Sequence, residues 1–169
     1  CPPARGLAPT EPAGRGRPLP GGQSAASAAQ DLACVHARAL ALLPTLEELF
    51  EAWGSLPTAL CHGDIHPLNV VWGEEGLLAV IDWEFAGARP ALYDLANCLG
   101  CLAMEGGSLA TPFAAALLEA ARRGGLLPDG QAPLLAPMIL ATRFGWLSEW
   151  LRRGDAAALA SELAFMAFL

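Results

Sequence analysis

Residues 60–97 read LCHGDIHPLNVVWGEEGLLAVIDWEFAGARPALYDLAN, and this stretch decides the fold that we expect. The apolar runs at 70–72 and 77–81 are typical of short strands. Between them, residues 73–76 carry a glycine at each end and two acids in the middle, which is typical of a turn. The stretch therefore predicts a β-hairpin.

The open end of this hairpin brings two oxygen-bearing side chains together. In a ribbon folded about Glu74 and Glu75, Asn69 and Asp82 lie within a residue or two of opposite each other, and paired strands are separated by roughly 5 Å. Hard oxygen donors of this kind suit Mg²⁺, which keeps its other positions for water and substrate phosphates. Asp64 precedes Asn69 closely in the chain, so we expect its carboxylate beside that metal.

The order of these residues resembles the superfamily of aminoglycoside phosphotransferases, choline kinases and homoserine kinases, the small-molecule branch of the protein-kinase-like fold. In that family HGD, four further residues and Asn form the catalytic loop, and here these positions run from His62 to Asn69. A later IDW or IDF at a strand end replaces the DFG of protein kinases. That position is filled here by Ile81, Asp82 and Trp83.

The resemblance implies an ATP-dependent phosphotransferase that acts on a hydroxyl of a small molecule such as an aminoglycoside, choline or homoserine. By the same resemblance Asp64 accepts or orients the proton of the attacking hydroxyl, while Asn69 and Asp82 hold Mg²⁺ against the nucleotide phosphates of ATP. Members with nearly the same motifs use different alcohols, so the motifs leave the substrate open.

Asp94 and His62 are expected to support this loop. Leucines recur at helical spacing over residues 92–102, which places Asp94 in the first turn of a helix, where an anion is favoured. Asp94 therefore has two compatible roles: it caps this helix, or, as the family implies, it accepts hydrogen bonds from the backbone of the catalytic loop. For His62 the resemblance implies bracing of the loop that carries Asp64.

Two other readings of the motif are weaker. His62, Asp64 and His66 alternate, as in a metallohydrolase site, but the third histidine of the chain is His36, far upstream. A protein kinase is disfavoured because Gly63 stands where the HRD motif has arginine, and because the next helix follows too soon for an activation segment.

Residues 24–169 are otherwise helical in pattern, so we expect a mainly α fold with one small β-hairpin, the C-terminal lobe of a protein-kinase-like (α+β) fold, with its catalytic loop and hairpin at 60–85. The expected boundaries are a capping box at Thr45 and Glu48, a helix from Thr111 to Gly124, a helix from Leu134 to Arg153 and a last helix capped by Asp155.

The chain shows no counterpart of the smaller N-terminal kinase lobe. That lobe carries a nucleotide-covering loop and a strand lysine, whereas this chain has no lysine and begins with a Pro- and Gly-rich stretch at 1–23. We expect 1–23 to be a linker or disordered lead. The chain, which starts at Cys1, is expected to be a fragment without its N-terminal lobe; the alternative is a non-catalytic remnant that only binds.

The net charge of the chain limits the classes of partner that it can bind. A formal net charge of -7 and a pI near 4.8, with no basic cluster, exclude a nucleic-acid surface. Acidic side chains suit a cationic amine substrate, and we also expect an exposed apolar patch where the missing lobe docks. The candidates for a substrate pocket are Glu84, Asp94, Glu105, Trp146 and Glu149.

The five cysteines predict neither a disulfide scaffold nor a zinc site, because the one CxxC pair, Cys98 and Cys101, falls on a helical run. Residues 1–23 lack the apolar core of a signal peptide. The apolar run at 156–169 is shorter than the roughly 20 residues that a membrane span needs. These observations predict a cytoplasmic protein.

Overall fold

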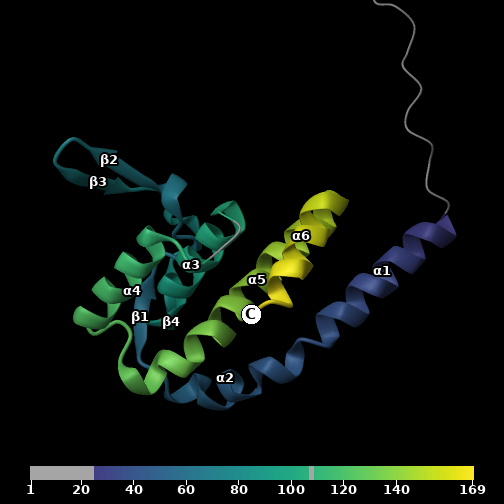
Figure 1. Ribbon diagram of the computed structural model, residues 1–169, viewed down its shortest axis with the longest axis horizontal. Coiled ribbons are helices and arrows are strands. Elements are labelled where there is room, and N and C mark those ends of the chain that lie inside the picture. Colours follow the sequence, from purple (N-terminus) through teal and green to yellow (C-terminus); the bar gives the residue numbers. More distant parts are fainter. Residues whose placement is uncertain (1–24, 107–108) are drawn as a thin grey trace, which may run out of the picture. The chain divides into compact units, whose positions relative to one another are not determined.

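The computed structural model describes residues 25–106 and 109–169 (Figure 1). The chain divides into two units, Cys1–Cys34 and Val35–Leu169. In the first unit the described residues form the beginning of helix α1 (Ala25–Leu40). The linker predicted at 1–23 lies outside the described residues.

The second unit is mainly helical, as predicted. Besides the C-terminal part of α1, it contains α-helices and short 3-10 helices, some of which adjoin an α-helix while others lie between strands. They are α2 (Glu47–Ala52), α3 (Tyr93–Gly106), α4 (Pro112–Arg123), α5 (Leu135–Arg153) and α6 (Ala156–Met166), with η1 (Leu43–Leu46), η2 (Trp53–Ser55), η3 (Pro67–Asn69), η4 (Trp83–Phe85) and η5 (Asp129–Leu134).

Three helix ends form where the sequence predicted them. The Thr111 hydroxyl accepts a hydrogen bond from the Ala114 amide at 3.1 Å and starts α4. Gly154, in the left-handed region at φ 67°, ends α5. The Asp155 carboxylate then accepts from the Ala158 amide at 2.9 Å and caps α6.

The predicted capping box at Thr45 and Glu48 is wrong. A capping box needs an extended residue at the N-cap, but Thr45 lies inside η1 and the N-cap of α2 is Leu46, whose backbone is helical and whose side chain makes no cap. Pro44 favours a tight helical turn here, and the buried Leu46 and Leu49 hold the chain against the core.

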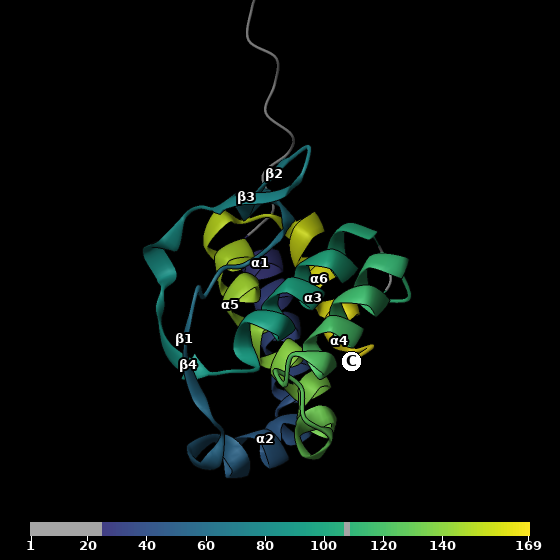
Figure 2. The ribbon, with the colours of Figure 1, turned by 90° about the vertical axis from the view of Figure 1, so that its left-hand side faces the viewer.

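The hydrophobic core lies mainly between α3 and α5, with α2, η1 and α6 around it (Figure 2). A β-carbon at Gly100 of α3 would lie 3.1 Å from Cδ of Arg143 and 3.3 Å from Cγ2 of Ile139, so α3 and α5 approach closely at this point. The most deeply buried side chains of the core include Leu49, Leu92, Leu99, Met138, Leu140, Leu163 and Met166.

The predicted hairpin is confirmed. Strands β2 (Val70–Gly73) and β3 (Gly76–Val80) pair antiparallel, with Gly73 opposite Gly76 and therefore a turn at Glu74 and Glu75. The ribbon projects from the helical body of its unit (Figure 1). At its open end the Ile81 amide donates to the Asn69 carbonyl at 3.0 Å, so Asp82 lies one residue from a position opposite Asn69.

A second pair of strands was not predicted. Strand β1 (Thr58–Cys61) pairs antiparallel with β4 (Gly87–Pro90), with Cys61 opposite Gly87. Neither segment has a clear alternating pattern, and β4 contains a glycine and ends in a proline. The pairing joins segments distant in the chain, and it places the two motif segments at neighbouring strand ends.

Large apolar side chains are exposed along residues 60–85. They are Leu60, Leu68, Val71, Trp72, Leu77, Leu78, Ile81, Trp83 and Phe85. We call this set the exposed apolar segment. Among the described residues, no helix is long and apolar enough to cross a membrane.

Candidate active site

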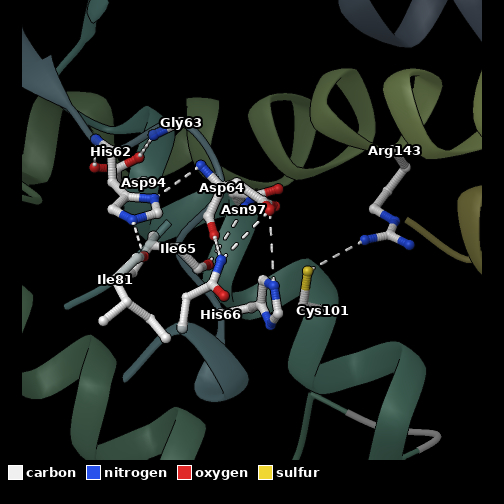
Figure 3. Close-up of polar contacts among 11 residues, drawn as sticks. His62, Gly63, Asp64, Ile65, His66, Ile81, Asp94, Asn97, Cys101 and Arg143 are labelled. Atoms are coloured by element: carbon white, nitrogen blue, oxygen red, sulfur yellow. Dashed lines mark hydrogen bonds and ion pairs between the residues drawn. The ribbon is translucent and has the colours of Figure 1, made fainter. Parts of the chain in front are cut away.

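The first turn of α3 holds the loop that follows β1. The Asp94 carboxylate accepts a hydrogen bond from the His62 amide at 2.7 Å through Oδ2 and one from the Gly63 amide at 2.9 Å through Oδ1 (Figure 3). Both oxygens of one side chain are thus engaged by consecutive backbone amides. This geometry is the loop-holding arrangement that the family resemblance implied for Asp94.

The His62 ring is enclosed by the same loop. Its side chain is 3 % exposed, and its Nδ1 accepts from the Asp64 amide at 3.2 Å. An accepting Nδ1 assigns the proton to Nε2, which donates to the Ile81 carbonyl at 2.8 Å. Both ring nitrogens therefore have partners, and His62 links the loop to the end of β3 rather than offering a base.

Asn69 holds the part of the loop that carries the Asp64 carboxylate. Its Nδ2 donates to the Asp64 carbonyl at 2.9 Å and lies 3.5 Å from the Asp64 Oδ2. Because a carbonyl only accepts, the amide group must turn its nitrogen toward Asp64. Its oxygen Oδ1 then has no protein donor among the described residues and is available to a ligand.

Asp82 follows strand β3 at the open end of the hairpin. It is exposed and has a left-handed backbone, with φ 66° and ψ 58°, the one non-glycine residue with positive φ in the described chain. Such a conformation costs energy for a residue with a β-carbon and is found at functional sites. It turns the chain from β3 into η4.

The metallohydrolase reading gains no support. His66 Nε2 lies 3.7 Å from Asp64 Oδ2, but the ring of His62 is turned to Ile81. Within residues 25–106 and 109–169, no group of three or more His, Cys, Asp or Glu side chains could hold a metal ion. One carboxylate and one amide, Asp82 and Asn69, still match the small protein ligand set that Mg²⁺ uses.

Gly63 is required by its surroundings. Its φ is 87°, and a β-carbon there would lie 2.3 Å from the Phe85 carbonyl oxygen and 2.8 Å from the Arg89 Nη1. That Nη1 donates to the same Phe85 oxygen at 2.7 Å, and the guanidinium lies 4.9 Å from the centre of the Tyr93 ring. Arg89 thus ties the turn after Asp82 to the loop and to α3.

Asp64 opens onto a pocket with a volume of about 500 Å³. The same pocket is lined by Glu84, Trp146 and Glu149, three of the side chains that the sequence offered as candidates for a substrate pocket. The structure therefore brings these four residues together from a loop, a 3-10 helix and α5. The side chain of Glu105, another sequence candidate, lies outside the described residues.

Glu149 is not a free acid in this pocket. Its carboxylate accepts from Arg152 Nε at 2.7 Å and Nη2 at 2.6 Å, and from Arg153 Nε at 2.6 Å. These hydrogen bonds, that of Arg152 first, lower the pKa of Glu149 to about 2. A cationic substrate would have to displace an arginine to reach it, so the acidic character of the pocket rests on Asp64 and Glu84.

Sequence reasoning missed several polar residues of the pocket wall, among them Tyr93, Asn97, Thr142 and Arg153. Burial raises the pKa of the Tyr93 phenol, so its hydroxyl stays protonated at neutral pH. Helical spacing could have revealed them, because Asn97 follows Tyr93 by one turn, and Thr142 and Arg153 share the helix face of Trp146.

A loop braced by Asp94 and His62, a carboxylate at a pocket and two oxygen donors at a hairpin end form the arrangement that the family resemblance implies. The chain belongs to the phosphotransferase enzyme family, whose model matches residues 2–135. It thus falls in the superfamily that includes aminoglycoside phosphotransferases and homoserine kinases.

Among curated proteins, the chain is similar to a homoserine kinase from Polaromonas naphthalenivorans (strain CJ2). The two are 34 % identical over 97 residues, which cover 56 % of this chain and 31 % of the relative. The chain thus matches about a third of the length of that kinase. No solved structure matches it.

Proposed function

We propose that the gene product containing this chain transfers the γ-phosphoryl group of ATP to a hydroxyl of a small molecule bound in the Asp64 pocket. One observation carries this proposal: His62 and Asn69 hold the backbone of Asp64 at the wall of a pocket, and the Asp64 carboxylate lies 3.5 Å from Asn69 Nδ2. Catalysis of phosphoryl transfer is mainly positioning and charge stabilisation, which such a braced carboxylate supplies.

Each residue then has a defined role. Asp64 orients the hydroxyl of the acceptor and accepts its proton as the phosphoryl group is transferred. The free Oδ1 of Asn69 and the exposed carboxylate of Asp82 would hold Mg²⁺. When bound, Mg²⁺ neutralises and orients the phosphates of the nucleotide. Asp94 and His62 touch neither substrate nor metal and act by positioning Asp64.

L-Homoserine is the first acceptor to test, because the curated relative is a homoserine kinase. This amino alcohol carries the hydroxyl that the reaction needs and the cationic amine that the Asp64 and Glu84 carboxylates attract. Choline and aminoglycosides are the comparison substrates, since the family resemblance covers them equally.

A second lobe completes the proposed enzyme. The exposed apolar segment carries Trp72 at 61 % and Leu60 at 77 % exposure, and the same stretch of chain contains the predicted metal ligands Asn69 and Asp82. Exposed apolar patches of this kind favour a protein contact. We place there the nucleotide-covering lobe that the kinase-like fold implies, and we place the reaction in the cytoplasm, where ATP is available.

The test is alcohol-dependent ADP formation by the purified gene product with Mg-ATP, using L-homoserine, choline and an aminoglycoside. Asp64→Asn is expected to lower kcat by about a hundredfold or more, the usual contribution of a positioned base. The exposed Asp129 provides a matched control, since Asp129→Asn makes the same change outside the pocket.

Absence of ADP formation with every acceptor, or an Asp64→Asn variant as fast as the control, contradicts the enzymatic role. In that case the second hypothesis, a kinase-like lobe that only binds, is favoured, and binding of Mg-ATP or an alcohol without turnover would support it.

A further inference from the structure

The inner wall of the Asp64 pocket, where α3 meets α5, contains two buried polar side chains that the proposed reaction does not use. Asn97 is 3 % exposed and Thr142 is 6 % exposed, yet both line the pocket. Buried polar groups are almost always hydrogen-bonded. The bonding capacity that the protein leaves unused at these residues therefore indicates what the pocket accepts.

Asn97 presents an acceptor. Its Nδ2 donates to the Ile65 carbonyl at 3.3 Å, and because a carbonyl cannot donate, the nitrogen must face that side. Within residues 25–106 and 109–169 the oxygen Oδ1 has no hydrogen-bond donor. Among the described residues no side-chain oxygen or nitrogen is both fully buried and unpartnered, so this oxygen keeps some exposure, and the pocket is an opening that Asn97 lines. Figure 3 shows Asn97 beside the Asp64 loop.

Thr142 presents an acceptor too. Its hydroxyl donates its one proton to the Ile139 carbonyl at 2.8 Å, one turn back in α5. What the hydroxyl oxygen can still offer is its lone pairs. A ligand group on this wall therefore meets acceptors from two helices and no proton donor from either residue.

The rest of the pocket favours a cation next to these acceptors. Asp64 and Glu84 contribute carboxylates, and Trp146 contributes an aromatic ring, which attracts cations over its face. Arg153 is the one basic residue among the pocket-lining side chains, and its Nε is engaged by Glu149. A positive group with its own N–H donors is the chemistry that fits both the charge and the acceptors.

We propose that Asn97 and Thr142 select substrate alcohols that carry a primary ammonium group, because their side-chain oxygens accept hydrogen bonds from the N–H groups of that ammonium. This inference rests on the proposed function for its setting, since the ammonium belongs to the alcohol that Asp64 would activate. A primary ammonium has three N–H donors, whereas a quaternary ammonium has the same charge and none. The pocket thus distinguishes the two by hydrogen bonding.

The first test compares L-homoserine with its N,N,N-trimethyl derivative, using chemical-shift titration of the full chain to obtain both dissociation constants. A hydrogen bond to a charged group is worth enough that we expect the trimethyl compound to bind at least about tenfold more weakly. Equal affinities would overturn the proposal without any variant being made.

The second test separates hydrogen bonding from ligand size. Thr142→Val keeps the shape of the side chain and removes its acceptor, so L-homoserine should bind about tenfold more weakly while the trimethyl compound is unchanged. Thr142→Ser should restore the preference. The matched control is Thr58→Val on the exposed strand β1, which should leave both affinities as they are.

A loss of the same size for both ligands in Thr142→Val contradicts the proposal, because a purely structural role of Thr142 predicts that result. The outcome is distinct from failure of the proposed function, which is judged by ADP formation. If the chain binds the primary ammonium more tightly but makes no ADP, this inference is supported and the proposed catalysis is contradicted. If it makes ADP but binds both ligands equally, catalysis is supported and this inference is contradicted.

Discussion

Gly63 shows how one residue sets the geometry of the Asp64 loop. The loop turns between β1 and η3 with a positive φ at this glycine, and the Phe85 carbonyl and the Arg89 guanidinium fill the space that a side chain would need. The HGD motif therefore needs glycine for two physical reasons, backbone conformation and close approach. Arginine, which protein kinases carry at this position, has no room.

At this residue scale we predict that Gly63→Ala lowers the free energy of unfolding by about 2 kcal/mol or more, from the strained backbone and the contact with a carbonyl oxygen. Urea unfolding measures it. Gly54→Ala is the matched control, because a β-carbon at Gly54 meets nothing within 4 Å, and its effect should stay within about 1 kcal/mol. Equal losses in both variants would show that the Gly63 contact is relieved at little cost.

At the scale of elements, α3 reaches the loop through the carboxylate of Asp94. An asparagine there keeps one acceptor oxygen but turns an NH₂ group toward the second amide, leaving a backbone N–H of His62 or Gly63 unpaired. An unpaired buried donor costs about 1–3 kcal/mol. We therefore predict that Asp94→Asn speeds hydrogen exchange of these amides by about tenfold or more.

Asp155→Asn is the control for this variant. Asp155 caps α6 through one amide, a task that asparagine performs equally well. Its exchange rates and stability should remain close to those of the parent chain. If the loop amides of Asp94→Asn exchange as slowly as before, the carboxylate does not hold the loop.

The C-terminal end of α5 carries the pH-dependent feature of this region. Arg152 and Arg153 lower the pKa of Glu149 to about 2, with the Arg152 hydrogen bonds the larger cause. A carboxyl whose pKa is lowered on folding stabilises the folded chain above its unfolded pKa and ceases to do so as pH falls through the folded value. This contribution should disappear between pH 4.5 and about 2.

We predict that carbon-13 NMR of the Glu149 carboxyl gives a midpoint near 2. Arg152→Gln should move that midpoint upward, and Glu149→Gln should make unfolding less sensitive to pH in the same interval. A midpoint in the ordinary glutamate range in the parent chain would mean that the arginines do not hold this side chain in solution.

At the scale of the whole second unit, a buried ion pair joins α5 to α6. Arg143 donates to Glu162 through Nε at 2.6 Å and Nη2 at 2.7 Å, and the side chains are 3 % and 0 % exposed. Trp150 Nε1 also donates to Glu162 at 3.1 Å, and the Arg143 guanidinium lies 5.6 Å from the Trp146 ring. The pair thus connects the core to the tryptophan that lines the pocket.

We predict that Glu162→Gln lowers the free energy of unfolding by about 3–5 kcal/mol, because it leaves the buried Arg143 charge without its counterion. The exposed pair of Glu119 and Arg123 is the control, with side chains 67 % and 71 % exposed. Glu119→Gln should cost less than about 1 kcal/mol. Equal and small losses in urea unfolding would mean that water reaches Arg143.

The local patterns were enough to predict much of this unit. The hairpin follows from apolar runs around two glycines, and the ends of α4, α5 and α6 follow from Thr111, Gly154 and Asp155, whose effects act within one turn of the chain. The capping box predicted at Thr45 is equally local, but packing overrides it. The buried Leu46 keeps the backbone helical at that point.

The distant pairings were not predictable in the same way. Strands β1 and β4 are short and lack alternation, so their pairing depends on what the intervening hairpin and α3 bring together. Glu162 appeared as a lone acid in an apolar helix, and its partner Arg143 lies one helix away, where spacing along a helix carries no information. The pairing of Glu149 with Arg152 and Arg153 is local by contrast, because the partners stand three and four residues along the same helix, and this spacing could have been recognised in the sequence.

By itself, therefore, the sequence determined the helices, the hairpin and the order of Asp64, Asn69, Asp82 and Asp94, because propensity, turns and motif spacing act between near neighbours. Only the tertiary structure decided that the Asp94 carboxylate holds the loop, and that Asn97 and Thr142 line the pocket of Asp64 with their N–H and O–H groups turned to backbone carbonyls. Those facts depend on which helices pack together, and the direction of a hydrogen bond is settled only when its partner is in place.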